Sequence, residues 1–135
     1  MRDEQVRRYS RHILLPDVGG LGQTALLVSA ARLELREGEP DAELLAATYL
    51  VAGGVGTLVI RGASDAQRAQ LAAHGPDTRI ATTPLLEPDG RDTSCELALQ
   101  PRPPWWPSAG GDATALAFWR GGLAATRWMA EIANR

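Results

Sequence analysis

Acidic side chains crowd one short stretch of this 135-residue chain. The stretch contains one glycine, and the residues concerned are Gly38 with Glu37, Glu39, Asp41 and Glu43. A glycine-rich turn before a helix can hold the phosphates of a nucleotide, because backbone amides approach the anion closely there. A carboxylate beside an incoming phosphate instead costs about 1 to 4 kcal/mol. The residue types therefore predict a turn that stabilises its own helix and repels a nucleotide.

The elements on either side predict where this turn lies. Residues 32–36 alternate apolar and charged side chains, which indicates a strand. Pro40 suits the first position of a helix over 41–52, and Gly53–Gly54 suits its end. A β-branched run at 57–60 predicts the next strand. Strand, helix and strand form a βαβ unit, whose strands are parallel and whose crossover is right-handed.

The first thirty residues predict a separate helical arm. Charge pairs spaced four apart favour a short helix over 3–11, and a second helix is expected over 21–30. These residues hold too few apolar positions for a core of their own. We therefore expect an arm (1–30) that docks on an α/β domain (31–135) or on a partner.

The second half predicts a helix and a β-hairpin. Ser64 and Gln67 form a capping box that opens a helix to His74. Strands are expected over 79–86 and 93–100, joined by a type I turn at Glu87–Gly90.

An extended segment over 101–108 leads to the last helix, which begins at Asp112 or Thr114 and runs to about residue 134. Gly121–Gly122 allows a neighbour to approach this helix closely. Its expected buried stripe is Leu116, Trp119, Leu123, Thr126 and Ala130.

Composition excludes several functions. A net charge of −2 gives no electrostatic reason for binding nucleic acid or an anionic membrane. No apolar run is long enough to span a bilayer, so a cytoplasmic protein is expected. A single cysteine, Cys95, excludes an internal disulfide and a multi-cysteine zinc site, and the chain has no lysine. The arginine-rich, alanine-rich composition indicates a bacterial genome.

Residues 8–16 and 19–23 resemble the amino-terminal arm of the ThiF/MoeB/HesA family. These are adenylating enzymes that activate ubiquitin-like sulfur-carrier proteins. The likeness continues through 31–33 and resumes at 49–50 and 53–58. It implies an α/β fold with a truncated, Rossmann-like ThiF-type βαβ core, to which the arm, the β-hairpin and the last helix are added.

The departures from the family imply lost chemistry. The acidic turn stands where the glycine-rich nucleotide loop belongs, at 37–42, and Arg61 or Gly62 replaces the ribose-binding aspartate. Only Asp65–Arg68 survives of the Asn-Leu-x-Arg-Gln segment, and the catalytic lysine and the paired Cys-x-x-Cys zinc ligands have no counterpart. The resemblance thus implies a reduced relative with no ATP, magnesium or other metal cofactor.

Two arginines of the arm are candidate functional residues. In dimers of the family an arginine of the arm reaches the partner's nucleotide, and Arg11 matches that role better than Arg8. A guanidinium suits a phosphate because it is always charged and binds as a planar fork. The alternative is a solvated helix face with ordinary charge pairs.

Other reactive side chains favour structural roles. Cys95 has no histidine near it in the sequence and is expected to be a buried thiol. His12 and His74 have no metal-ligand spacing. Trp105 and Trp106 either contact a partner or plug the open side of a short sheet.

Three functions are compatible with these patterns. The first is a non-catalytic, dimerising scaffold or interaction protein, since the helix over 41–52 is apolar nearly all round and Tyr49 lies on it. Its partner is a second copy or a full-length ThiF-like protein. The second is a regulatory subunit that donates Arg11 to an active adenylyltransferase. The third is a small adenylating enzyme with an unfamiliar pocket, for which no cluster of catalytic groups is found.

Overall fold

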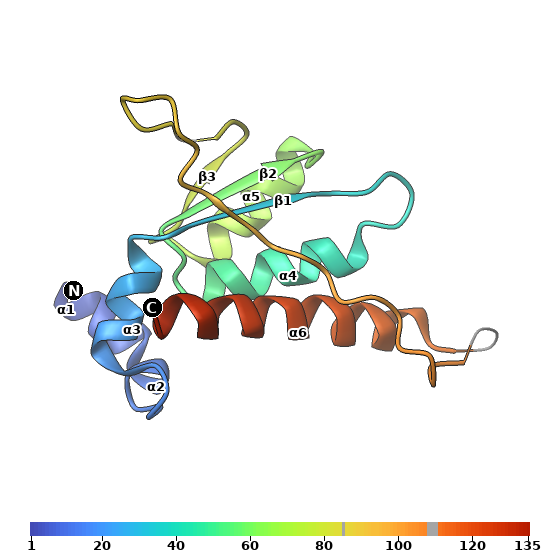
Figure 1. Ribbon diagram of the computed structural model, residues 1–135, viewed down its shortest axis with the longest axis horizontal. Coiled ribbons are helices and arrows are strands. Elements are labelled where there is room, and N and C mark those ends of the chain that lie inside the picture. Colours follow the sequence, from blue (N-terminus) through green and yellow to red (C-terminus); the bar gives the residue numbers. More distant parts are fainter. Residues whose placement is uncertain (85, 108–110) are drawn as a thin grey trace.

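A parallel sheet of four strands carries the fold (Figure 1). The computed structural model describes residues 1–84, 86–107 and 111–135. The strands lie in the order β3-β2-β1-β4, and all three pairings are parallel. Their bounds are β1 Ala30–Glu34, β2 Thr57–Arg61, β3 Arg79–Ala81 and β4 Cys95–Glu96. The α/β class and the parallel βαβ unit are confirmed.

Helices connect the strands as a Rossmann-like core requires. Helix α4 (Asp41–Ala52) links β1 to β2, and α5 (Asp65–His74) links β2 to β3. Both begin and end at the predicted residues. Pro40 is the residue that precedes the first turn of α4, and Ser64 and Gln67 form the expected capping box of α5. Helix α6 (Ala113–Ala133) follows β4.

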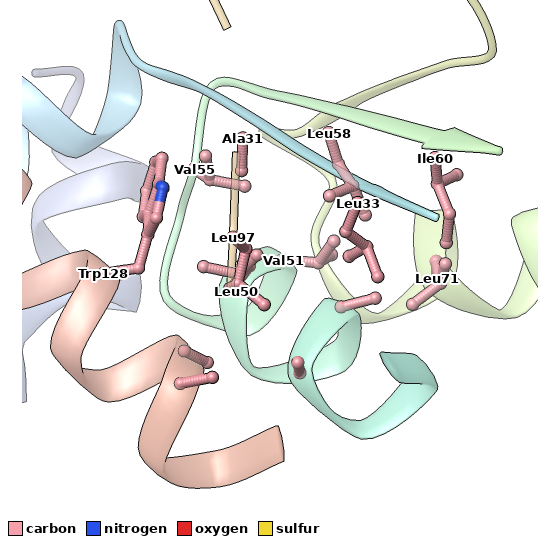
Figure 2. Close-up of a cluster of buried hydrophobic side chains, with 14 of the residues drawn as sticks. Ala31, Leu33, Leu50, Val51, Val55, Leu58, Ile60, Leu71, Leu97 and Trp128 are labelled. Atoms are coloured by element: carbon pink, nitrogen blue, oxygen red, sulfur yellow. The ribbon is translucent and has the colours of Figure 1, made fainter. Parts of the chain in front are cut away.

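The hydrophobic core lies on one face of the sheet (Figure 2). Strands β1 and β2 turn alternate side chains towards it, among them Leu33, Leu58 and Ile60. Leu50 and Val51 of α4 pack against these, and the same cluster includes Leu71 of α5 and Trp128 of α6. All three helices therefore cover the same face.

The opposite face of the sheet carries charged side chains beside one buried apolar residue, Val59. Arg32 and Glu34 of β1 and Arg61 of β2 alternate with the core residues and so point away from the helices. Parallel sheets usually bury both faces and read as continuous apolar runs. Here one strand, β1, alternates like a strand with one solvated face.

The predicted buried stripe of α6 is wrong. Thr126 and Ala130 are exposed, and Leu116, Trp119 and Leu123 are only half-buried. The buried face is instead made largely of small residues, namely Ala117, Gly121, Ala124 and Ala125. Trp128 and Ile132 complete it. The reason is the close packing of α6 on α4, where a Cβ atom at Gly121 would overlap the carbonyl oxygen of Ala42.

The predicted hairpin of two paired strands is also wrong. Strand β3 pairs with β2 and β4 pairs with β1, so the two strands lie at opposite edges of the sheet. The turn itself is present, since the amide of Gly90 donates to the carbonyl oxygen of Glu87 at 2.8 Å. One antiparallel bridge, Leu86 to Asp92, is what remains of the pairing. Residues 85 and 108, which end or interrupt the predicted segments, lie outside the described residues.

The arm consists of three short helices. They are α1 (Asp3–Arg8), α2 (Ser10–Ile13) and α3 (Gly19–Leu27), so the helix expected over 3–11 breaks at Tyr9. Helix α3 packs against the C-terminal half of α6 (Figure 1). None of the helices in the described residues has the length and apolar character to cross a bilayer. The division of the chain at residue 30 stays a prediction.

Candidate functional site

The turn between β1 and α4 is open to solvent. Gly38 has φ = +86°, and no atom lies within 4 Å of a Cβ built on it. Glu37, Glu39 and Asp41 are exposed, so their carboxylates surround the entrance to the turn. As expected, Asp41 lies in the first turn of the helix, together with Glu43.

Glu43 is the exception among these carboxylates because it is buried. Its side chain is 3% exposed, and the Nε of Arg36 donates to its Oε1 at 2.6 Å. Among the described residues its Oε2 has no hydrogen-bond partner. A glutamate at this third helical position normally accepts a hydrogen bond from the amide of the residue that caps the helix. That residue is Pro40, which has no amide hydrogen, so the oxygen stays unpaired.

Arg8 is engaged within its own chain. Its guanidinium pairs with the carboxylate of Asp77, in the loop between α5 and β3. Arg2, Gln5 and Tyr9 donate to the same carboxylate, whose side chain is 3% exposed. Burial on its own would raise the pKa of Asp77, but the hydrogen bonds from Gln5, Tyr9 and Arg8 outweigh it and hold that pKa below its usual value.

A second set of contacts fixes the arm to the end of α4. Tyr9 is buried, and its ring lies over Gly54, where a Cβ atom would be 2.6 Å from its Cζ. Gln23 is fully buried, donates from Nε2 to the carbonyl oxygen of Gly53 at 3.0 Å, and lies 3.1 Å from the Nδ1 of His12 through Oε1. The arm therefore docks on the α/β domain, which is one of the two expected arrangements, and residues of the arm motif make the contacts.

Arg11 differs from Arg8 in its surroundings. Its side chain is exposed, and among the described residues it takes part in no ion pair. It projects from α2, two residues after the buried Tyr9.

The tryptophan pair packs against α6. The ring of Trp105 meets Trp119 edge-on, with centroids 6.2 Å apart, and Trp106 lies 5.8 Å from Trp105. These contacts join the pair to the helix rather than to the sheet. Trp105 remains 70% exposed. Tyr49 is partly exposed on α4 and lies against Gly122 of α6, where a Cβ atom would be 3.4 Å from its ring.

The remaining reactive side chains have structural surroundings. Cys95 is half-buried, and Nη1 of Arg135 lies 3.5 Å from its sulfur. His12 contacts Gln23, and His74 is exposed at the end of α5. Across the described ranges no three metal-ligating side chains come together.

Fold and site together define a class of protein: a truncated Rossmann-like α/β domain with a docked helical arm and an acidic turn after its first strand. No protein-family model matches the chain.

Two curated relatives are similar to the chain. Both are named "Probable adenylyltransferase/sulfurtransferase MoeZ", from Mycobacterium tuberculosis strains CDC 1551 / Oshkosh and ATCC 25618 / H37Rv. Each is 35% identical in an alignment of 99 residues that covers 62% of this chain and 24% of the relative. MoeZ is a member of the ThiF/MoeB family, so the match supports the resemblance of the chain to that family. The chain spans about a quarter of the length of these relatives.

Proposed function

We propose that this chain is a non-catalytic ThiF/MoeB-like protein that acts as a dimerising scaffold or interaction module in the bacterial cytoplasm. The observation that carries the proposal is the buried carboxylate of Glu43 in the first turn of α4. A polyphosphate at that helix end would approach this carboxylate and the exposed Glu37, Glu39 and Asp41. At this solvent-exposed turn each such pair is repulsive by about 1 to 4 kcal/mol.

The residues at the turn do not fit ATP. Two arginines lie near the first turn: Glu43 engages Arg36, and the Nε of Arg120 donates to the carbonyl oxygen of Gln100. The chain has no lysine for the phosphates, and Arg61 ends β2 close to where the family's resemblance places a ribose-binding aspartate. We therefore assign no reaction step to ATP in this chain.

Calorimetric titration with ATP and magnesium tests this proposal. We expect no saturable heat at micromolar ATP. A variant with Glu37→Gln, Glu39→Gln and Asp41→Asn removes three exposed carboxylates and should bind inorganic triphosphate more tightly than the parent. The matched control, Glu87→Gln with Asp89→Asn, changes exposed carboxylates of another turn and should have no such effect. Saturable micromolar binding of ATP by the parent would contradict the proposal.

The outer side of α4 and α6 is the surface we propose for a second copy. Phe118 is 51% exposed on α6. The ring of Tyr49 lies against Gly122, one turn later on the same helix. Met129 lies further along α6. Together with Leu15 of the arm it lines an apolar hollow of about 250 Å³. Apolar side chains gathered on one face are typical of an association surface.

Sedimentation equilibrium measures this association. The parent should be a dimer, and Phe118→Asp should shift it to the monomer, because an introduced charge is costly at a dry contact. Val28→Asp is the control, since Val28 is 82% exposed and lies at the end of α3 instead. A parent that stays monomeric, or a Phe118→Asp variant that stays dimeric, would contradict this surface.

The exposure of Arg11 favours a second function, a subunit that donates this arginine to a full-length family member. Its guanidinium is free to reach a partner, whereas Arg8 is held by Asp77. Pyrophosphate exchange by that partner should fall when the chain carries Arg11→Ala. Arg7→Ala, at another exposed arginine of the arm, is the control and should leave the exchange unchanged. Equal exchange with all three chains would exclude this role.

A further inference from the structure

Three neighbouring strands end in charged residues that line one hollow. Glu34 ends β1, Arg61 ends β2 and Glu96 ends β4. All three border a cavity of about 270 Å³, together with Arg32, Leu33, Pro84 and Asp92. The hollow thus lies at the carboxyl ends of the strands and does not involve the β1–α4 turn.

The strand order makes this a favoured place for a ligand. The chain moves from β1 outward to β2 and β3, then returns to the other side of β1 as β4. In open α/β sheets, ligands bind outside the carboxyl ends of the strands where the order reverses in this way. The face that carries Arg32, Glu34 and Arg61 is the one that the three helices leave uncovered.

One wall of the hollow is fixed by hydrogen bonds. Arg32 pairs with Asp92, and its Nη2 lies 3.7 Å from the Oε2 of Glu96. The amide of Ser94 donates to Asp92 at 2.8 Å, and its hydroxyl donates to the same oxygen. These bonds, from Ser94 first and then from Arg32, hold the pKa of Asp92 below its usual value. Asp92 is therefore ionised at neutral pH, and Arg32 is engaged.

The opposite wall offers two charges that do not engage one another. Glu34 and Arg61 are partners in the β1–β2 register, so their side chains leave the sheet on the same face. Both are exposed, and among the described residues they form no ion pair, with one another or with a third group. A positive and a negative group stand side by side, each with hydrogen-bonding capacity unused.

We propose that this hollow binds a small zwitterion, an α-amino acid. The guanidinium of Arg61 receives the carboxylate as a planar fork. Glu34 and Glu96 receive the ammonium group, and Pro84 supplies the apolar part of the lining, since the side chain of Leu33 points into the core. Three carboxylates against two guanidinium groups, one of them engaged by Asp92, disfavour a polyanion such as a nucleotide. This binding is separate from the scaffold function and does not depend on it.

Amide NMR shifts of the full chain, titrated with the standard amino acids one at a time, test the proposal. At least one amino acid should give saturable shifts centred on Glu34, Arg61 and Glu96. Arg61→Gln and Glu34→Gln should each weaken its binding by about tenfold or more, since each removes a charge-assisted hydrogen bond. Arg79→Gln, at an exposed arginine of β3 outside the hollow, should leave it unchanged.

Separate titrations with acetate and methylammonium show whether binding needs both the carboxylate and the ammonium group of the ligand. Each carries one half of the zwitterion and should bind far more weakly than the amino acid. Absence of saturable shifts with every amino acid would overturn the proposal. So would equal binding by acetate alone, or shifts that persist unchanged in both Arg61→Gln and Glu34→Gln. The ATP titration has a different ligand and readout, so failure there leaves this result unaffected.

Discussion

The hydroxyl of Tyr9 donates a hydrogen bond to the Oδ2 of Asp77 at 3.0 Å, across 68 residues of sequence. Arg2 and Gln5 donate to Oδ1 of the same carboxylate at 3.0 and 3.1 Å, and Arg8 pairs with Oδ2. One buried carboxylate therefore joins four residues of the arm to the loop between α5 and β3. The docked position of the arm depends on it.

Asp77→Asn should loosen the arm and destabilise the fold by about 2 kcal/mol. The change removes charge-assisted hydrogen bonds, and the new side-chain amide faces groups of the arm that are themselves donors. The free energy of unfolding from urea titration measures the loss, and limited proteolysis should cut the arm sooner. Asp65→Asn is the control, because that carboxylate is 98% exposed and should contribute less than about 1 kcal/mol. Equal stability of the parent and Asp77→Asn would contradict this role of the carboxylate.

Alkaline pH should release the arm through Tyr9. Burial, and next the hydrogen bond to Asp77, raises the pKa of Tyr9 from 10.0 to about 12. A group whose pKa is raised in the folded state stabilises the fold fully below its unfolded pKa, and this contribution is lost as the pH rises towards the folded value. The free energy of unfolding should therefore fall between pH 10.0 and about 12.

Tyr9→Phe separates this effect from general alkaline unfolding. The variant lacks the hydroxyl, so it should be less stable than the parent at neutral pH and lose less stability over the alkaline range. Urea midpoints measured across that range compare the two chains. Parallel pH profiles would show that Tyr9 is not the titrating group.

Adjacent glycines of α6 should respond to alanine in opposite directions. A Cβ atom at Gly121 would overlap the carbonyl oxygen of Ala42, so Gly121→Ala should push α6 from α4 and cost about 1 to 3 kcal/mol. At Gly122 the nearest atom is the ring of Tyr49 at 3.4 Å, which allows a methyl group. Gly122→Ala should stabilise by about 0.5 to 1 kcal/mol through helix propensity. Thermal unfolding of both variants measures this, and a shift of the same sign in both would contradict the packing.

Local signals predicted the local elements. The capping box at Ser64 and Gln67 and the Pro40 and Gly53 boundaries depend on neighbours a few residues apart, and the bounds of α4 and α5 follow from them. The turn at Glu87–Gly90 is local in the same sense. The pairing of the strands on either side of this turn is not local, because β3 pairs with β2 and β4 pairs with β1.

The buried face of α6 and the residues that dock the arm were missed for related reasons. Hydrophobic periodicity selects large side chains, but a close helix pair needs small ones, as at Gly121 against Ala42. Asp77 lies in a loop with no motif, and only the fold brings Tyr9 to it. The candidate turn at Glu37–Asp41 was predicted because it is a contiguous sequence, whereas the hollow of Glu34, Arg61 and Glu96 needs the strand order.

The pair of Arg36 and Glu43 should be strongly coupled. Arg36→Ala leaves the carboxylate of Glu43 buried without its cation, which we expect to cost about 3 kcal/mol. In a Glu43→Gln background the same change removes a partner from a neutral amide and should cost less than about 1 kcal/mol. Urea unfolding of the parent, both single variants and the double variant gives the coupling energy.

Arg91→Ala is the control for this cycle, since Arg91 and Asp89 form an exposed ion pair that should contribute less than about 1 kcal/mol. Additive effects of the Arg36 and Glu43 changes would mean that the carboxylate is not held as a buried charge. The argument against a phosphate at the first turn of α4 would then lose its main support, because a solvated or neutral Glu43 repels an anion far less.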